Sequence, residues 1–170
     1  YRYMPPVNKF IKKIHNKNIG KLKMLSIREH RFPFLKKVKN WNRFSKNTGG
    51  TFVEKCCHFF DLMRLITKSE AKKVMAISGQ AVNHKDEKYD GMTPDIDDHG
   101  YVIIEFENGI KGMLELCMFA EGSRYQEEIS VVGKSGKIEA LVPGPGRFWQ
   151  HKTYPQPTPQ VVISPREGEP

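Results

Sequence analysis

The chain has 170 residues, of which 38% are hydrophobic, and this size suits one globular domain with a buried core. It has no apolar run near the ~20 residues of a membrane-spanning helix, and its net charge of +9 arises in the first 50 residues, where Glu29 is the single acid. The three cysteines fit neither a disulfide framework nor a paired zinc site, so we expect a reducing, cytoplasmic setting.

The first predicted element is an amphipathic helix that begins at Pro5 and Pro6 and ends before Gly20. Its apolar residues recur at helical spacing, with lysines on the opposite side: Val7, Phe10, Ile11 and Ile14. The cations here and in the following residues are dispersed, and no nucleic-acid-binding motif accompanies them. We therefore interpret them as a solvated surface and expect no nucleic-acid partner.

A strand-like segment runs from Leu22 to about His30, and residues 32–50 then form a long connection. Connections of this length are often functional. Four polar or aromatic residues stand out at the strand end and in this connection: His30, Arg31, Trp41 and Arg43. The alternative interpretations are a salt-bridge cluster at the strand end and an aromatic side chain that anchors the loop.

A second helix is expected over about 51–67, after which the pattern becomes that of strands. The predicted strands cover 74–82, 100–107, 111–119, 127–133 and 137–142. Short turns at 107–109 and 133–136 would join antiparallel neighbours. The sequence therefore predicts an α+β fold, a mainly antiparallel open sheet with helices packed on one face. Two strands are apolar on both sides, which predicts a homo-oligomer that covers the other face.

We expect residues 1–142 to form the domain and residues 143–170 to form a proline-rich extended tail, in which only 160–163 could pair. The chain begins at Tyr1 without the zones of a secretion signal. It is therefore interpreted as a piece of a longer protein.

The most informative segment is the helix from Thr51 to Ile66. Glu54, His58 and Asp61 fall on one polar stripe of a helix that is otherwise apolar nearly all round. Ionisable groups on such a helix are costly unless they are paired or face a cleft, so the stripe is a candidate site. The residues alone leave two other interpretations open. Thr51 and Glu54 match a capping box, and His58 with a nearby carboxylate is a partial metal site that lacks a third ligand.

The run Gly49-Gly50-x-x-x-Glu54-x-x-x-His58-x-x-Asp61 resembles a helix of the glucose-fructose oxidoreductase and inositol dehydrogenase (Gfo/Idh/MocA) family, G-G-x-x-x-D-x-x-x-H-x-x-D. Further turns resemble those of the family in the same order: 19–21, 108–109 and 133–136. The resemblance covers about residues 1–142. It implies the C-terminal, substrate-side domain of a NAD- or NADP-dependent oxidoreductase that acts on a hydroxyl of a sugar, polyol or related compound.

The resemblance also implies roles for particular residues. His58 would take the proton of the reacting hydroxyl, and Glu54, which stands where the family usually has Asp, would orient or tune it. His30, Arg31, Trp41 and Arg43 would contact the substrate, and no metal is implied.

The family's other catalytic parts do not occur in this sequence. Its members bind the dinucleotide in a preceding Rossmann domain with a G-x-G-x-x-G turn, and their catalytic lysine lies in a Glu-Lys-Pro tripeptide. We therefore expect this chain to be inactive by itself and to work against an N-terminal nucleotide-binding domain. The alternative is a non-catalytic small-molecule-binding or subunit-interface domain of the same fold.

Overall fold

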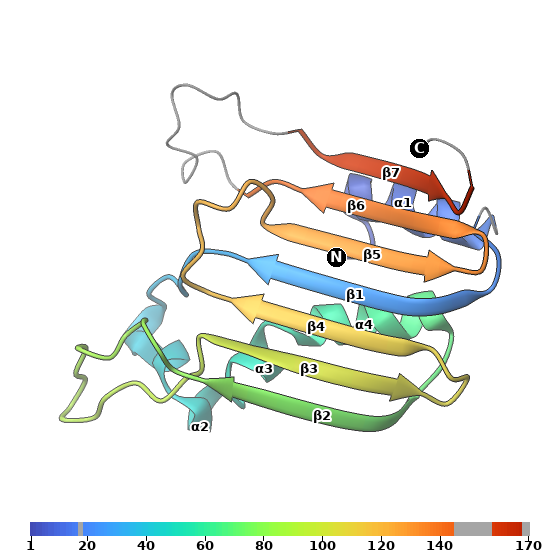
Figure 1. Cartoon of the computed structure of the whole chain (residues 1–170). Helices are drawn as coiled ribbons and strands as arrows, with labels where there is room; N and C mark the ends of the chain where they lie inside the picture. Colours follow the sequence, from blue (N-terminus) through green and yellow to red (C-terminus); the bar gives the residue numbers. More distant parts are fainter. Residues whose placement is uncertain (17–18, 145–157, 168–170) are drawn as a thin grey trace.

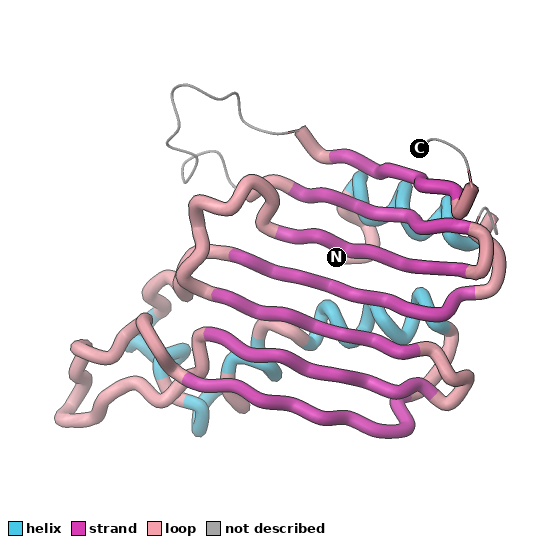
Figure 2. Tube along the Cα trace, in the orientation of Figure 1, coloured by secondary structure: helices cyan, strands magenta, loops and turns pink. Residues whose placement is uncertain are grey.

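The computed structural model describes residues 1–16, 19–144 and 158–167. In these residues one seven-stranded sheet carries the helices on one of its faces (Figures 1 and 2). The helical elements are α1 (Pro5–His15), the 3₁₀ segment η1 (Val38–Arg43), α2 (Ser45–Thr48), α3 (Thr51–Glu54) and α4 (Cys57–Thr67). The strands are β1 (Leu22–His30), β2 (Ala71–Gly79), β3 (His99–Phe106), β4 (Lys111–Cys117), β5 (Glu127–Gly133), β6 (Gly136–Val142) and β7 (Gln160–Pro165).

The strand order is β2-β3-β4-β1-β5-β6-β7, which places β1 in the centre. β1 pairs in parallel with β4, and the other pairings of the described strands are antiparallel. The predicted α+β class with helices on one face is confirmed, although the sheet is mixed. The parallel pair is possible because a long connection, which contains the helices, β2 and β3, separates β1 from β4 in the chain.

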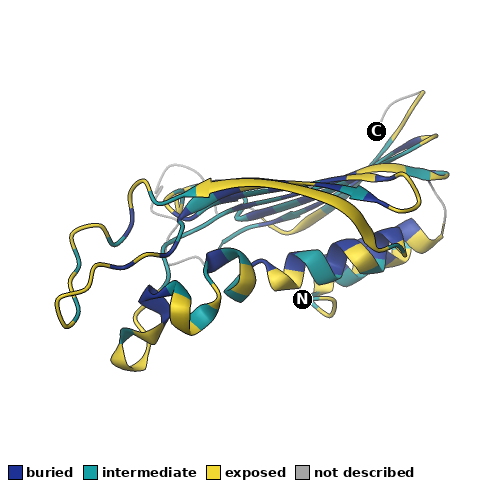
Figure 3. Cartoon of the chain, turned by 90° about the horizontal axis from the view of Figure 1, so that it is seen from below, coloured by how far each residue is buried: buried dark blue, intermediate teal, exposed yellow. Residues whose placement is uncertain are grey.

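The core lies between the sheet and the two longer helices, as Figure 3 shows edge-on. Alternate residues of β1, Leu25 and Ile27, are buried and point toward the helices. Phe10 of α1 and Phe59 of α4 are fully buried in the same cluster. The helices therefore cover the face of the sheet that carries the buried alternate positions, and α3 and α4 are held against it by their apolar sides.

The predicted helix over 51–67 is divided. α3 ends at Glu54 and α4 begins at Cys57, so Lys55 and Cys56 form a break between them. We call residues 54–58 the α3–α4 break. The helical period alone could not reveal it, because the apolar spacing continues through the break.

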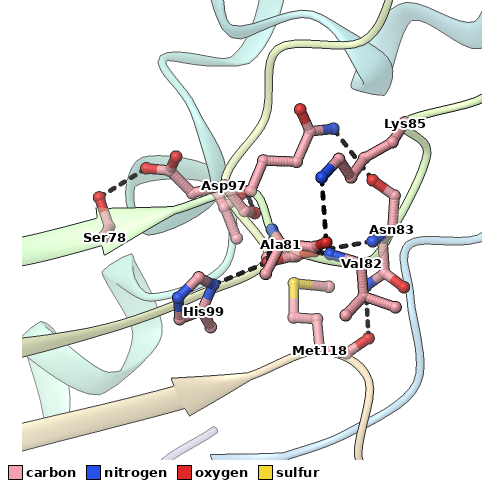
Figure 4. Close-up of polar contacts among 11 residues, drawn as sticks. Ser78, Ala81, Val82, Asn83, Lys85, Asp97, His99 and Met118 are labelled. Atoms are coloured by element: carbon pink, nitrogen blue, oxygen red, sulfur yellow. Dashed lines mark hydrogen bonds and ion pairs between the residues drawn. The ribbon is translucent and has the colours of Figure 1, made fainter.

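The strand β2 begins and ends three residues earlier than predicted. Its first residues are exposed at the sheet edge and carry no apolar signal. It ends at Gly79 because the backbone amides of Ala81, Val82 and Asn83 donate hydrogen bonds to the side chain of Asp98 instead of to a neighbouring strand. Figure 4 labels these three residues after the end of β2. The predicted pairing of 160–163 is confirmed, since β7 lies beside β6. Residues 145–157 of the predicted tail lie outside the described residues.

Candidate functional site

The α3–α4 break carries both predicted catalytic residues. Glu54 is the last residue of α3, and His58 is the second residue of α4. His58 is exposed, and its imidazole ring stacks on the ring of Tyr1 with a centroid distance of 5.9 Å and an interplanar angle of 16°. Within the described residues no hydrogen bond joins Glu54 to His58. His58 is therefore exposed to solvent and packed against one aromatic ring.

The Glu54 carboxyl group is not used by the helix. Gly50 is the N-cap residue of α3, with φ of 88°, and the hydroxyl of Thr51 donates instead to the carbonyl of Asp97. The capping-box interpretation is therefore wrong. Among the described residues, Glu54 Oε2 is buried without a hydrogen-bond partner, an arrangement that costs free energy until a donor arrives.

Burial raises the pKa of Glu54, whereas three nearby cations oppose the rise: Lys37, Arg31 and Arg43. The carboxyl group thus lies in a partly desolvated, cationic environment. Such environments are typical of groups that take part in proton transfer, and they also suit a carboxylate that holds a neighbouring imidazole.

Arg31 lies on the same side of the sheet as the α3–α4 break. Its Nη1 is 3.7 Å from Oε1 of Glu29, and its Nε donates to the carbonyl of Phe32 at 3.1 Å. The guanidinium also covers the Phe32 ring at 4.4 Å from the centroid. The positive charge of Arg31 also opposes the rise in the pKa of Glu54. Arg31 therefore acts electrostatically on the candidate site from the end of β1.

His30 lies on the opposite face of the sheet. Successive residues of a strand point to opposite faces, and Glu29 and Arg31 take the helix side. His30 Nε2 is 2.8 Å from Glu115 Oε1 of the neighbouring strand β4. The structure therefore does not bring His30 and His58 together. This geometry matches the alternative interpretation of His30 as part of a strand-end ion pair.

Trp41 and Arg43 belong to η1 but differ in exposure. The Trp41 side chain is 40% exposed, and its carbonyl accepts a hydrogen bond from Asn47. Arg43 is only 2% exposed, and its Nε donates to Glu87 Oε2 at 3.0 Å. Arg43 thus anchors the loop between β2 and β3, whereas Trp41 remains accessible.

The Glu87 carboxylate that receives Arg43 should make stability depend on pH. Burial raises its pKa, but hydrogen bonds from His84, Tyr89 and Arg43 together lower it from the ordinary 4.5 to about 2. A lowered folded-state pKa gives stability that is present above pH 4.5 and is lost as the pH falls toward 2. We expect Glu87→Gln to cost about 2 kcal/mol at pH 7. In urea unfolding the difference from wild type should shrink toward zero near pH 2, and a pH-independent difference would contradict it.

A group of buried and partly buried polar residues at the α3–α4 break was not predicted from the sequence: Tyr1, Glu29, Lys55 and Glu127. Glu29 is fully buried and Glu127 is nearly so. One signal was available in the sequence. Glu29 continues the alternation of Leu25 and Ile27 and therefore had to face the core, and it is the single acid of the first 50 residues.

Asp61, the third residue of the polar stripe, forms an exposed ion pair with Arg2 through its carboxylate. That pair lowers the pKa of Asp61 through hydrogen bonding. In the part of the chain that the structure describes, no group of three or more His, Cys, Asp or Glu side chains is placed to hold a metal ion.

Residues 11–164 match the family model described as "Oxidoreductase family, C-terminal alpha/beta domain". A search of the curated proteins finds no match. Among solved structures, a probable dehydrogenase from Thermotoga maritima is 27% identical with a TM-score of 0.65, and the match covers 82% of this chain and 39% of that protein.

Two more distant structures show the same fold. The WlbA dehydrogenase from Bordetella pertussis, in complex with NADH and UDP-GlcNAcA, is 15% identical with a TM-score of 0.63 and coverages of 81% and 40%. The aldose-aldose oxidoreductase from Caulobacter crescentus, complexed with glycerol, is 14% identical with a TM-score of 0.66 and coverages of 99% and 46%. The chain thus spans less than half the length of these solved proteins.

Proposed function

The chain belongs to the Gfo/Idh/MocA family of oxidoreductases, and from this membership we propose that it is the substrate-binding and catalytic half of a NAD(P)-dependent enzyme. The enzyme would oxidise a hydroxyl of a sugar, polyol or related compound, or reduce the corresponding carbonyl. The observation that carries the proposal is the α3–α4 break, where His58 is exposed and the Glu54 carboxyl is not used by the fold.

The proposed chemistry separates a hydride from a proton. The nicotinamide of a bound NAD or NADP would accept the hydride from the carbinol carbon. In the oxidation direction the His58 imidazole takes the hydroxyl proton as the carbonyl forms, and in reduction it returns the proton. Glu54 lies one turn earlier and favours the imidazolium that this transfer creates. Both steps need water excluded from the exposed side of His58, which a nucleotide-binding domain would cover.

We propose Arg31 and Trp41 as substrate contacts. Arg31 lies on the helix side near Glu54, and Trp41 presents an accessible ring in the adjoining connection. His30 and Arg43 are not carried into this proposal. His30 faces the other side of the sheet, and Arg43 is buried against Glu87.

The dinucleotide would be held mainly outside this chain. The Gly133–Gly136 turn is followed by strand β6 rather than by a helix. A Cβ added at Gly136 would meet the Ser164 carbonyl oxygen at 2.7 Å, so this turn is packed against β7, and it lacks the helix N-terminus that a phosphate-binding turn would supply. The residues of this chain supply the proton acceptor and substrate contacts.

We also propose that the open face of the sheet binds a second copy of the chain. Apolar side chains gather there on neighbouring strands, and Met75 and Ile77 are 74% and 73% exposed. Met75 pairs with Ile103, and Ile77 with Tyr101, so the four form one continuous patch. Exposed apolar patches of this kind mark interfaces.

Ile103→Lys should therefore dissociate the oligomer. A charge in the centre of the patch would be desolvated in the interface and would remain in water in the monomer. Light scattering should report a fall to the monomer mass. The control is Val38→Lys, which changes an 80% exposed side chain of η1 outside the patch. Wild-type mass in both variants would refute this interface.

A cytoplasmic setting is part of the proposal. It rests on three unpaired cysteines, of which Cys57 is exposed, because thiols persist in reducing compartments. None of the described helices has the length and hydropathy to span a membrane.

The binding of NADH tests the division of labour. The full-length protein should quench or shift the nicotinamide fluorescence on titration, and the 170-residue chain alone should not. If the full-length protein does not bind NADH or NADPH, the oxidoreductase proposal fails and the alternative, a non-catalytic domain, is favoured. Equal binding by the isolated chain would contradict the proposed location of the cofactor.

A further inference from the structure

Five polar residues gather at the α3–α4 break, two of them buried and three partly buried, and we call them the Glu29 cluster: Tyr1, Glu29, Arg31, Lys55 and Glu127. Glu29 on β1 and Glu127 on β5 are direct neighbours across the two strands. Both point toward the helices and are buried. Two carboxylates and two cations are thus enclosed between the sheet and the break.

Lys55 is the closest partner of Glu29. Its Nζ lies 3.0 Å from Glu29 Oε1, while Arg31 Nη1 lies at 3.7 Å. The ammonium also lies near two neighbouring aromatic rings, 5.5 Å from the centroid of Tyr1 and 5.3 Å from that of Phe59. The Lys55 ammonium is therefore held by one carboxylate and by a pair of adjacent rings.

The position of Lys55 in the chain connects this ion pair to the site. Lys55 follows Glu54 directly and lies three residues before His58, at one of the two positions that belong to neither α3 nor α4. The Tyr1 ring that contacts Lys55 also stacks on the imidazole of His58. Lys55 is therefore linked to Glu54 through the backbone and to His58 through the ring of Tyr1.

Burying two charges costs more free energy than a well-packed apolar pair of the same size, so the pair is weak evidence for a gain in stability. It does hold the chain at one position, because a displaced Lys55 would leave both charges buried and unpaired. The break also keeps backbone hydrogen bonds, since the Lys55 amide donates to the Thr51 carbonyl at 2.8 Å and the Cys56 carbonyl accepts from the amides of Phe59 and Phe60. The ion pair adds a side-chain contact that joins the break to the central strand of the sheet.

We propose that Glu29 and Lys55 are positioning residues of the candidate active site, whose ion pair fixes the α3–α4 break and so sets where Glu54 and His58 stand relative to each other. The inference rests on the proposed function for its kinetic consequences. Neither residue touches the substrate in this account.

The environment of Glu29 adds a pH dependence. Burial raises its pKa to about 7, against the opposing charges of Lys55 and Arg31. Five groups face it: Lys55 and Cys56 from the break, Arg31 from the strand end, Glu127 from β5 and Tyr1 from the N-terminal segment. Glu29 is ionised above pH 7 and takes a proton below it, which removes the anion that holds Lys55.

The first test compares Glu29→Gln with Glu70→Gln in the full-length enzyme. Glu70 also pairs with a cation, Arg64, but at an exposed position. Glu29→Gln should lower kcat at pH 8 by tenfold to about a hundredfold, the scale of a misplaced catalytic group, with a smaller change in KM, and Glu70→Gln should leave both unchanged. A normal kcat in folded Glu29→Gln would overturn the proposal.

The pH profile separates positioning from simple stability. In wild type, protonation of Glu29 should add a fall in kcat as the pH drops through about 7. Glu29→Gln should lack this added fall, so the ratio of wild-type to variant kcat should shrink toward one at low pH. A ratio that does not change with pH would show that Glu29 acts on stability alone.

A double variant guards against a failure to fold. Glu29→Gln leaves Lys55 buried without its anion, whereas Glu29→Gln with Lys55→Met removes both charges at similar volume and should fold. Its kcat should remain at least tenfold below wild type, because no tether is left in the break. Recovery of wild-type kcat in the double variant would contradict the proposal.

If the wild-type enzyme turns over no hydroxyl compound, the proposed function fails. The positioning role is then tested by the NMR signals of His58, without a measurement of activity. The NMR signal of its Cε1 proton, and the contact between the Tyr1 and His58 rings, should change in Glu29→Gln and not in Glu70→Gln. An unchanged His58 signal and ring contact in both variants would overturn the positioning role independently of activity.

Discussion

Replacing His58 with alanine in the full-length protein is expected to lower kcat a hundredfold or more, the usual scale for losing a general base. His58 is exposed and makes only a ring contact to Tyr1 within the described residues. The substitution should therefore change the melting temperature little. Steady-state turnover of the hydroxyl substrate at pH 8, together with thermal unfolding, measures both effects.

The matched control is His15→Ala, which removes another exposed imidazole, at the end of α1 and away from the α3–α4 break. It should keep wild-type kcat and KM. Wild-type turnover in His58→Ala would refute the assignment of His58 as the proton acceptor, even if the enzyme is a dehydrogenase. Loss of activity in both variants would point to a general effect on folding.

Replacing Asp98 with asparagine is expected to destabilise the domain by about 2 kcal/mol, since the amide group keeps one acceptor oxygen and roughly 1 kcal/mol is lost for each of the two amides left without an acceptor. Asp98 is buried, and its two oxygens accept hydrogen bonds from the amides of Ala81, Val82 and Asn83 and from His99 Nδ1 (Figure 4). The asparagine NH₂ group has the same shape but cannot accept, so it would face donors.

The neighbouring Asp97→Asn serves as the control. The Asp97 carboxylate accepts one exposed hydrogen bond, from Ser78, and its loss should cost less than about 1 kcal/mol. Urea unfolding at pH 7 would compare the two variants with wild type. Equal, small losses in both would show that Asp98 does not hold the start of the β2–β3 loop.

Much of the fold was predictable from the sequence, because apolar and polar residues alternate clearly along the strands. The strand from Leu22 to His30 and that over 127–133 were predicted with the bounds that the structure has. Features that depend on distant residues were not predictable. The end of β2 is set by Asp98, nineteen positions after Gly79, and no local pattern signals that contact.

The candidate site shows the same division. The polar stripe that carries Glu54 and His58 was visible as helical spacing, because residues three or four apart share a helix face. The break that separates them was not visible in this spacing, and neither was the contact of Lys55 with Glu29, which lies 26 residues earlier in the chain. The face of His30 was predictable from the alternation of β1 and was misjudged, because strand-end residues were treated as one group.

The measurement that tests the proposed oxidoreductase function most directly is the turnover of hydroxyl compounds. The full reading frame should be expressed and NAD⁺ and NADP⁺ reduction followed by absorbance over a panel of polyols, sugars and sugar acids, in wild type and His58→Ala. The account predicts that at least one hydroxyl compound drives reduction in wild type and that the rate collapses in the variant. A protein that binds no nicotinamide dinucleotide and reduces none with any compound would contradict it and leave a domain with an interaction role only.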